Sequence, residues 1–295
     1  MTTSSQLVAI FAETALHPGT GQGDGVIDRE VQRDITTGHP EIAGSSWKGA
    51  LKAHVREATD DATATRLFGS DPGEPVSDSR LAVSAGSICA FPVPIDATGF
   101  GWITSLSALA QITLIARPTG VSVPGLPDQP DDHAALGPAS TPNDVRAEIV
   151  TFKATADAAV TEWAKWIADH AMPPNPEFSY WRAKAAKALW VVSDAAFPLM
   201  TRQFTQIDEQ VALDSKKNVV GKALRTVEYL PRDTIMMSRV DGAENDVSEF
   251  TGIMTRSGPA VVGGDESTGK GVVWISTPRP QIAAAVLADS SAAVA

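Results

Sequence analysis

The amino-acid sequence predicts a protein of the α+β class, in which strands and helices are interleaved along one chain. Short apolar runs at Val8–Phe11 and Val272–Ile275 have the length and composition of buried strands. Between them, Val160, Trp163 and Ile167 recur at the spacing of one helix face. No tandem repeat is visible, so this alternation favours a mixed architecture in which helices cover a sheet.

Length and composition are those of a globular intracellular protein. A chain of 295 residues holds one large domain with insertions, or two smaller ones, around a sizeable core. The single cysteine, Cys89, excludes an intrachain disulfide, and its apolar neighbours predict a buried thiol. The polar N-terminus does not resemble a secretory signal, and no apolar run approaches the ~20 residues of a membrane helix. We therefore expect a cytoplasmic protein with no membrane partner.

The net charge of −11 counts against a simple nucleic-acid-binding protein, because such proteins tend to be basic. It does not exclude a protein whose few basic residues gather on one face. Any proposal of RNA binding has to account for this charge.

The first predicted strand leads into a glycine-rich loop that spans Leu16–Thr37. Closely spaced glycines give the backbone freedom and allow it to approach a ligand closely. The same composition also fits a loosely ordered surface loop. Glycine content alone therefore leaves both interpretations open.

A helix is predicted to follow from Trp47 to about Ala58, capped by Ser45 or Ser46. Three basic side chains recur on one of its faces, at Lys48, Lys52 and Arg56. Such a stripe is usually a solvated face. Here it follows a Gly/Ser turn, and a helix N-terminus is itself a site that favours anions.

The middle of the chain is expected to be partly irregular. The segment Arg117–Asn143 contains six prolines, which disfavour both helix and strand. A helix is predicted over Thr155–His170, a second short helix over Phe178–Lys187, and a strand over Leu189–Val192.

The segment Gly264–Lys270 has the GxxxxGK spacing of a phosphate-binding loop, but its context does not fit an NTPase. That motif needs Ser or Thr next and then a helix, whereas here Gly271 and a strand-like run follow. The remaining expectation is a glycine-rich turn that presents backbone N–H groups and Lys270 to a phosphate. A tight hairpin is the alternative.

Residues alone do not identify a catalytic site. His17 and Asp28 share the glycine-rich loop and could transfer a proton or bind a hard metal, although such residues are more often simply exposed. Glu228 and Tyr229, close to Pro231, are structural on the same reasoning. The sequence contains no His-Glu-x-x-His, paired-cysteine or nucleophile-elbow motif.

The order of several segments, however, resembles the RAMP superfamily, and specifically the backbone subunits of type III-B (Cmr) CRISPR effector complexes. The resemblance covers about residues 8–276, and the combination is specific although each motif alone is weak. The matching segments are LHPGTGQGDGVIDREVQRDITTGHPEIAGSSWKGALKAHVR, LFGS at 67–70, AFPVP and FGWIT within 90–104, VEYLPRDTIM at 227–236, and GGDESTGKG near the C-terminus.

This resemblance implies a fold. It predicts one domain over residues 1–295, built on an RRM-like, ferredoxin-like βαββαβ core with long insertions. The Pro-rich region of about 117–143 would be a variable insertion. A β-hairpin thumb would lie within about 197–230.

The resemblance also implies partners and an activity. The chain would bind guide RNA, stack with copies of itself in a filament, and contact other Cmr subunits. It would cleave complementary single-stranded target RNA at six-nucleotide intervals beside each thumb, with a divalent metal, Mg²⁺ or Mn²⁺. Asp28 matches the catalytic, metal-associated aspartate, and His17, Glu228 and Tyr229 match residues around the same cut site.

Further matched positions imply RNA contacts. Guide-backbone contacts are expected at Ser46, Lys48 and Gly49, with Lys52 and Arg56 on the same helix. Thumb and loop contacts are expected at Lys216, Lys217, Lys222, Arg225, Gly269 and Lys270. Departures from the family pattern at Trp47, Asp34 and Asp78-Ser79-Arg80 affect expected local packing rather than Asp28.

Three alternatives remain at this stage. The chain could be a non-catalytic guide-binding scaffold, the equivalent subunit of a type III-A (Csm) complex, or a guide-processing endonuclease that acts alone. Subunit number, metal identity and target sequence do not follow from the sequence. The acidic charge would be tolerated because A-form duplexes are read by shape and by sugar-phosphate contacts, while base pairing supplies the specificity.

Overall fold

The computed structural model describes residues 2–21, 26–148, 150–212, 214–218 and 224–280. A long strand, β1, lies inside its large sheet. β1 pairs antiparallel with β12 on one side and with β14 on the other, and β4 pairs with the far edge of β12. The unit consists of β1 (Thr3–Ala12), α1 (Gly44–Ala58), β4 (Gly86–Ile95), β12 (Ile235–Ala243), α7 (Glu244–Arg256) and β14 (Val272–Ser276).

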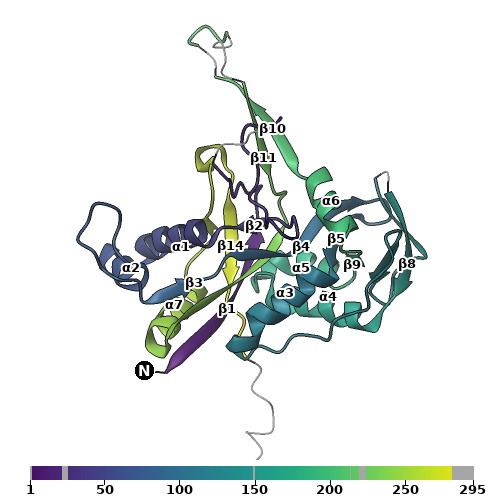
Figure 1. Cartoon of the computed structure of the whole chain (residues 1–295), viewed down its shortest axis with the longest axis horizontal. Coiled ribbons are helices and arrows are strands. Elements are labelled where there is room, and N and C mark those ends of the chain that lie inside the picture. Colours follow the sequence, from purple (N-terminus) through teal and green to yellow (C-terminus); the bar gives the residue numbers. More distant parts are fainter. Residues whose placement is uncertain (1, 22–25, 149, 213, 219–223, 281–295) are drawn as a thin grey trace, which may run out of the picture.

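These six elements read βαββαβ along the chain, and their strands lie in the order β14–β1–β12–β4. That pattern matches the predicted ferredoxin-like arrangement. The α+β class predicted from the sequence is confirmed, with helices on a large mixed sheet (Figure 1).

Both faces of the central sheet are buried, and the alternation of side chains along β1 shows why. Val8 and Ile10 point into a core that includes Trp47 of α1 and Phe250 of α7. Their neighbours Leu7, Ala9 and Phe11 point the other way, into a core with helices α3 (Leu106–Ala116) and α4 (Ala158–His170). Successive strand residues face opposite sides, so an uninterrupted apolar run is what a doubly covered strand requires.

A long insertion separates β4 from β12 and extends the sheet through β5, β9, β6, β8 and β7. Its elements are β5 (Gly99–Ser105), α3 (Leu106–Ala116), η1 (Arg117–Thr119), β6 (Ala134–Gly137), β7 (Asp144–Ala147), β8 (Val150–Ala156), α4 (Ala158–His170), η2 (Pro176–Phe178), α5 (Ser179–Ala185), β9 (Leu189–Val192) and α6 (Ala196–Gln203). The small elements elsewhere are β2 (Glu41–Ile42), α2 (Asp61–Phe68), β3 (Leu81–Val83), β13 (Ala260–Val261) and η3 (Glu266–Thr268).

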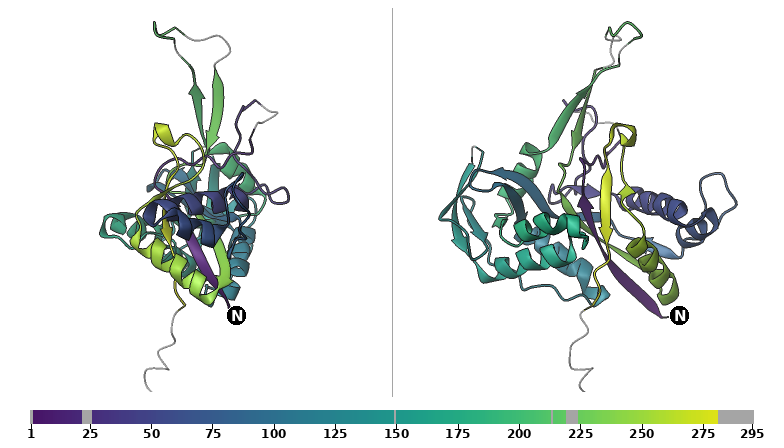
Figure 2. Two further views of the ribbon diagram at one scale, coloured as in Figure 1. Left: turned by 90° about the vertical axis from the view of Figure 1, so that its left-hand side faces the viewer. Right: turned by 180° about the vertical axis from the view of Figure 1, so that it is seen from behind.

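The insertion ends in a separate two-stranded hairpin, β10 (Gln206–Gln210) with β11 (Arg225–Tyr229). Figures 1 and 2 show it projecting from the body of the molecule, as the predicted thumb would. We refer to this β10–β11 hairpin as the thumb. The predicted contact Lys222 lies outside the described residues.

Most element predictions are confirmed, and three boundaries are wrong. The structure has strands at the predicted runs 8–11, 189–192 and 272–275, and helices over most of 47–58 and 178–187. The first helix begins earlier, at Gly44, with Ala43 at the N-cap and no side-chain cap, so the predicted serine cap is wrong. Its first-turn N–H groups are therefore without a capping side chain.

The other two differences come from sheet pairing. Thr155 was predicted to begin a helix, but it pairs with Leu136 within β8, and Asp157 caps α4 by accepting from the Val160 N–H. The Pro-rich segment was predicted to be irregular to Asn143, yet β6 begins at Ala134 because β8 and β9 offer it strand partners.

Two smaller expectations concern the thiol and the membrane. Cys89 is fully buried, as predicted, and burial raises the pKa of its thiol to about 12. Among the described residues, no helix is both long and apolar enough to span a bilayer.

Candidate functional site

The four residues predicted to surround a cut site come from three chain segments that meet at the base of strand β11. Leu16, beside His17, exchanges two backbone hydrogen bonds with Leu230, at 2.9 and 2.8 Å. The Arg29 N–H donates to the Thr226 carbonyl at 3.1 Å, and the Glu228 N–H donates to the Arg29 carbonyl at 2.9 Å. The predicted convergence of these segments is therefore observed.

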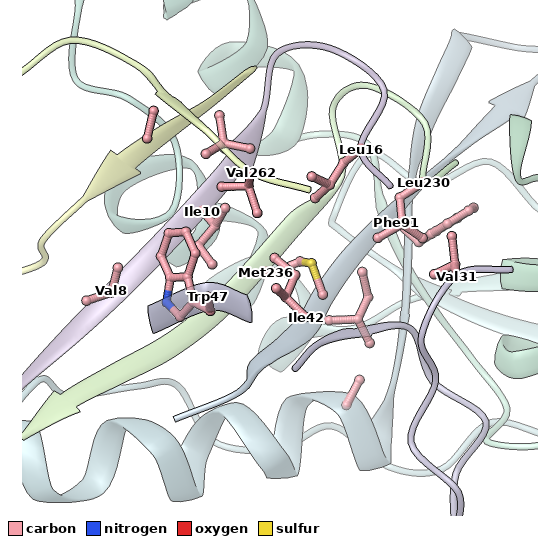
Figure 3. Close-up of a cluster of buried hydrophobic side chains, with 14 of the residues drawn as sticks. Val8, Ile10, Leu16, Val31, Ile42, Trp47, Phe91, Leu230, Met236 and Val262 are labelled. Carbon is pink, nitrogen blue, oxygen red and sulfur yellow. The ribbon is translucent and has the colours of Figure 1, made fainter. Parts of the chain in front are cut away.

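Apolar side chains anchor this junction in the core. Leu16, Val31 and Leu230 are at most 2% exposed, and Figure 3 shows them in one part of a cluster that extends past Val262 and Ile10 to Trp47 and Val8. Each of the site's segments contributes one of these side chains, so the burial of apolar surface holds the polar residues near one another.

Asp28 is an exposed carboxylate at the edge of the thumb. Its Oδ2 accepts hydrogen bonds from the Thr226 N–H at 2.7 Å and from Thr226 Oγ1 at 3.0 Å. These bonds hold the pKa of Asp28 below its usual value, so the group is ionised at neutral pH. Within the described part of the chain, its Oδ1 has no hydrogen-bond partner, which leaves one oxygen open to a ligand.

Glu228 differs from Asp28 because it is buried and both of its oxygens are used. Oε1 accepts from Arg33 Nη2 at 2.9 Å, and Oε2 accepts from the Val31 N–H at 2.9 Å. Arg33 also donates to the Thr201 carbonyl at 3.0 Å, which connects this pair to α6. Glu228 is thus placed to hold the junction together rather than to exchange protons.

Tyr229 is likewise committed to protein contacts. Its hydroxyl donates to Asp265 Oδ2 at 2.8 Å and accepts from Gln210 Nε2 at 2.9 Å. Burial, together with the nearby Asp265 carboxylate, raises the pKa of Tyr229 well above its usual value. The phenol therefore stays protonated, with its proton directed at Asp265.

His17 is buried, and its hydrogen bonding fixes its tautomer. Nδ1 lies 2.7 Å from the Glu228 carbonyl, which can only accept, so Nδ1 carries the proton. Burial lowers the pKa of His17, so the ring is neutral at pH 7 and Nε2 keeps its lone pair. A Cβ at position 19 would lie 2.4 Å from Nε2, which is why Gly19 suits this position. Among the described residues, no hydrogen bond joins His17 to Asp28.

A divalent metal would need ligands from outside the protein to be held at this site. Within the described ranges, no group of three or more His, Cys, Asp or Glu side chains could surround a metal ion. Of the carboxylates among the four predicted residues, Asp28 keeps an oxygen without a hydrogen-bond partner in the described part of the chain, whereas Glu228 does not. Mg²⁺ is commonly held by one or two carboxylates together with water and substrate phosphates, and the open oxygen of Asp28 would suit such a shared site.

The N-terminus of α1 is the clearest anion site among the predicted RNA contacts. Ser45 and Ser46 are exposed, the helix has no side-chain cap, and space is open around Gly49. Lys48 is half-buried on the same turn. Uncapped N–H groups and the helix dipole together favour a phosphate here.

The rest of the predicted basic stripe on α1 is already paired. Lys52 Nζ contacts Asp71 at 2.6 Å and is largely buried. Arg56 contacts both Asp61 and Asp71. These carboxylates neutralise two of the three cations, so Lys52 and Arg56 are less available to RNA than their helical spacing suggested.

Of the predicted RNA contacts on the thumb and the C-terminal loop, some are exposed and one is already paired with a carboxylate. Arg225, Lys216 and Lys217 are exposed. Gly269 has φ of +77° and open space around it, whereas Lys270 pairs with Asp208 of β10 at 2.8 Å. RNA binding at these positions remains a prediction.

Sequence reasoning missed the partners that organise the site, namely Arg33, Asp265, Thr226 and Arg29. One signal was available for two of them, because Arg29, Val31 and Arg33 alternate as residues on one side of an extended segment do. Asp265 gave no signal, since its partner Arg29 lies 236 positions away in sequence.

Comparison with known proteins gives a consistent result. A model of the RAMP superfamily matches residues 10–274. The CRISPR system Cmr endoribonuclease Cmr4 of Pyrococcus furiosus is 25% identical over 285 residues, which cover 92% of this chain and 94% of that protein.

Solved structures show the same fold. A crystal structure of oligomeric Cmr4 from Pyrococcus furiosus matches with a TM-score of 0.72 and 20% identity, over 94% of this chain and 98% of that one. A chain of the type III-B Cmr-beta complex bound to cognate target RNA matches with a TM-score of 0.73 and 19% identity, over 92% and 96% of the two chains.

Proposed function

This chain belongs to the RAMP superfamily, and from that premise we propose that it is a guide-RNA-binding backbone subunit of a type III-B CRISPR complex that cleaves complementary target RNA. The likeness to an endoribonuclease over nearly the whole of both chains supports this proposal. The observation that supports this proposal most is Asp28, an ionised, exposed carboxylate beside the thumb with one open oxygen.

The proposed chemistry uses the nucleophile that RNA already carries. A 2′-OH brought in line with the adjacent phosphate attacks phosphorus and gives up its proton, and the 5′-oxygen of the next nucleotide leaves and gains one. The upstream fragment then ends in a 2′,3′-cyclic phosphate and the downstream fragment in a 5′-OH. Alignment of these atoms supplies much of the rate, because the reacting groups no longer have to find each other.

In this proposal Asp28 would assist at the phosphate. Its open Oδ1 would hold a divalent cation, Mg²⁺ or Mn²⁺, whose charge would stabilise negative charge that develops on the phosphate oxygens. Thr226 orients Asp28 through two bonds to Oδ2, which leaves Oδ1 to face the RNA. Glu228, Tyr229 and His17 would act by holding the thumb and the Asp28 loop in register.

Guide binding is assigned to the uncapped start of α1, with Ser46, Lys48 and Gly49, and to the glycine-rich C-terminal loop. Backbone N–H groups at these sites can bind phosphates without a large basic surface, which reconciles RNA binding with a net charge of −11. Stacking with copies of itself, contacts to other Cmr subunits and a cytoplasmic location belong to the same proposal.

The direct test is cleavage by the assembled complex with Asp28→Asn, on end-labelled RNA complementary to the guide and with Mg²⁺ added. We expect a six-nucleotide ladder in the wild type and at least a ~100-fold lower cleavage rate in the variant, with target binding unchanged. A matched control is Asp34→Asn, because the Asp34 carboxylate also accepts from the N–H and Oγ1 of a single threonine, Thr37.

Two outcomes would count against the proposal. Tight target binding without any ladder in the wild type would favour the scaffold alternative. Cleaved ends that carry 2′-OH and 3′-OH groups would exclude the 2′-OH mechanism while leaving an RNA-guided nuclease.

A further inference from the structure

The C-terminal loop between β13 and β14, residues 262–271, touches every segment that builds the proposed cut site. Its backbone contacts the His17 segment through Gly264 N–H to the His17 carbonyl at 3.4 Å and Gly271 N–H to the Ala15 carbonyl at 2.8 Å. Gly263 has φ of +84°, and a Cβ there would lie 2.3 Å from the His17 carbonyl oxygen. The loop is therefore packed closely on the segment that carries His17.

Side chains of the same loop reach the thumb and the Asp28 segment. Asp265 accepts two bonds from Arg29 Nη1, at 3.2 and 3.1 Å, and one from the Tyr229 hydroxyl at 2.8 Å. Lys270 pairs with Asp208 of β10 at 2.8 Å and stands 4.6 Å from the centre of the Tyr229 ring. Asp265 is the one loop side chain that joins both the Asp28 segment and strand β11.

The local state of Asp265 suits this role. Burial alone would raise the pKa of its carboxyl, but the bonds from Tyr229 and Arg29 lower it, so the group is ionised at neutral pH. Its φ of 67° is left-handed, a conformation that Asp and Asn tolerate better than most residues. An Asp-to-Asn change there removes the charge without adding backbone strain.

Arg29 transmits this contact to Asp28 through the backbone. The two residues are adjacent, and their side chains leave in different directions, Asp28 toward Thr226 and Arg29 toward Asp265. The Arg29 backbone bonds to both Thr226 and Glu228 of β11. Fixing the Arg29 side chain on one side therefore restricts the rotation of the segment that presents the Asp28 carboxylate on the other.

We propose that Asp265 is a positioning residue through which the C-terminal loop sets the orientation of Asp28 against the thumb. This inference rests on the proposed function, in which the same loop holds the guide backbone. Through its bonds to Arg29 and Tyr229, Asp265 would keep the guide-holding loop, the thumb and the segment of the cutting carboxylate in one fixed arrangement. Asp265 does not itself touch the RNA phosphate that is cut.

The test compares three assembled complexes, wild type, Asp265→Asn and Asp241→Asn. Asp241 is a matched control because it is also a partly buried carboxylate with two bonds from one arginine, Arg239 Nε, both at 2.8 Å, yet it lies at the far end of β12. We measure guide and target affinity, and the single-turnover cleavage rate constant with all target bound.

We expect Asp265→Asn to lower the saturated cleavage rate constant about 10- to 100-fold, with affinities within about twofold of wild type, since misplacement by about 1 Å is enough for such a loss. Asp241→Asn should cleave at the wild-type rate. Arg29→Gln should reproduce the loss, and the double variant should be no worse than either single one, because both remove the same contact.

Amide hydrogen exchange provides a second readout that does not depend on cleavage. In Asp265→Asn, exchange should increase in Thr226–Tyr229 and in residues 28–32, and it should be unchanged there in the control. If exchange and the saturated rate are both unaffected, Asp265 is not a positioning residue. If affinity falls while the saturated rate does not, the loop acts only as a guide contact, and the inference is likewise wrong.

These results are separable from failure of the proposed function. A wild-type complex that does not cut, or an Asp28→Asn complex that cuts normally, would refute the role of Asp28. The exchange experiment would still decide whether Asp265 holds the thumb and the Asp28 segment together.

Discussion

Carboxylates at the two ends of strand β11 differ in exposure and in hydrogen bonding. At its exposed end, Thr226 bonds the Asp28 carboxylate, which faces solvent and keeps one oxygen open. At its buried end, both oxygens of Glu228 accept hydrogen bonds, from Arg33 and from the Val31 N–H. The Tyr229 hydroxyl donates to Asp265 and accepts from Gln210. The residues lie within a few positions of one another, but their chemistry is separated.

The comparison indicates that the two ends of β11 have different roles. A group can assist a reaction only if it retains an unpaired donor or acceptor that a substrate can reach. Asp28 meets that condition, whereas the polar atoms of Glu228 and Tyr229 are bonded to other residues at the base of the thumb. The exposed end is therefore expected to control rate, and the buried end to control folding and geometry.

The largest expected difference is between Glu228→Ala and Asp28→Ala in the isolated chain. Removing Glu228 leaves the largely buried side chain of Arg33 charged and without its carboxylate, which typically costs about 3–5 kcal/mol. Removing Asp28 breaks only solvent-exposed bonds. Urea unfolding should show a markedly lower midpoint for the Glu228 variant and nearly the wild-type midpoint for the Asp28 variant.

A Glu228→Ala protein as stable as wild type would contradict this difference in roles. Replacing both partners, as in Glu228→Leu with Arg33→Met, offers a sharper form of the test, because burying apolar groups in place of an ion pair is often neutral. The double variant should recover much of the stability that the single variant loses.

A smaller effect is expected for Tyr229→Phe. The ring stays buried, while the two hydroxyl bonds to Asp265 and Gln210 are lost, at a cost of about 1–2 kcal/mol. Because the phenol remains protonated in the wild type, we expect no loss of an ionisation from the pH–rate profile. A changed pH–rate profile would mean that Tyr229 takes part in proton transfer, so the buried end would also contribute to the reaction.

Local patterns predicted the fold most reliably where burial is uniform. The run Val8–Phe11 is apolar throughout because β1 is covered on both faces, and its composition is therefore enough to identify a strand. Start signals were less reliable. Ser45 and Ser46 favour a cap, yet α1 begins at Gly44 with no side-chain cap, because a cap preference is a weak local signal.

For the candidate site, the resemblance predicted that four residues lie together, but not what each contacts. The structure places His17 and the Asp28 segment against β11, which carries Glu228 and Tyr229, while their catalytic role stays a prediction. The resemblance could not show that Glu228 is saturated, because Arg33 lies 195 positions away. Ion pairs between distant segments leave no local pattern, and the paired state of Lys52 was missed for the same reason.

His17 predicts a pH dependence of the buried end. Burial lowers its pKa in the folded state, so below about pH 6.5 the unfolded chain binds a proton that the folded chain does not. Stability should therefore fall as the pH drops from about 6.5 toward the lowered pKa, and it should be fully present above that range. Burial lowers the pKa of His39 and His54 too, so they contribute in the same direction.

The measurement is the urea midpoint of wild type and His17→Gln between pH 5 and pH 8. The variant should be less stable at pH 8, because it lacks the bond to the Glu228 carbonyl, but its stability should fall less steeply on acidification. Equal slopes would mean that His17 is not held neutral by the fold.

The smallest effect is expected from Thr226→Val at the exposed end. Valine keeps the β-branched shape that suits a strand and keeps the bond from the Thr226 backbone N–H to Asp28. The bonds of the hydroxyl are removed: Oγ1 donates to Asp28 Oδ2 at 3.0 Å, accepts from the Asp28 N–H at 3.0 Å, and lies 3.3 Å from the Val26 carbonyl. Because these bonds are exposed, stability should hardly change, while the saturated cleavage rate of the assembled complex should fall about two- to tenfold as the orientation of the carboxylate is loosened. Thr226→Ser retains the hydroxyl and should restore most of the rate. A Thr226→Val complex that cleaves at the wild-type rate would mean that the backbone N–H alone orients Asp28, whereas a loss of stability would show that even the exposed end contributes to folding.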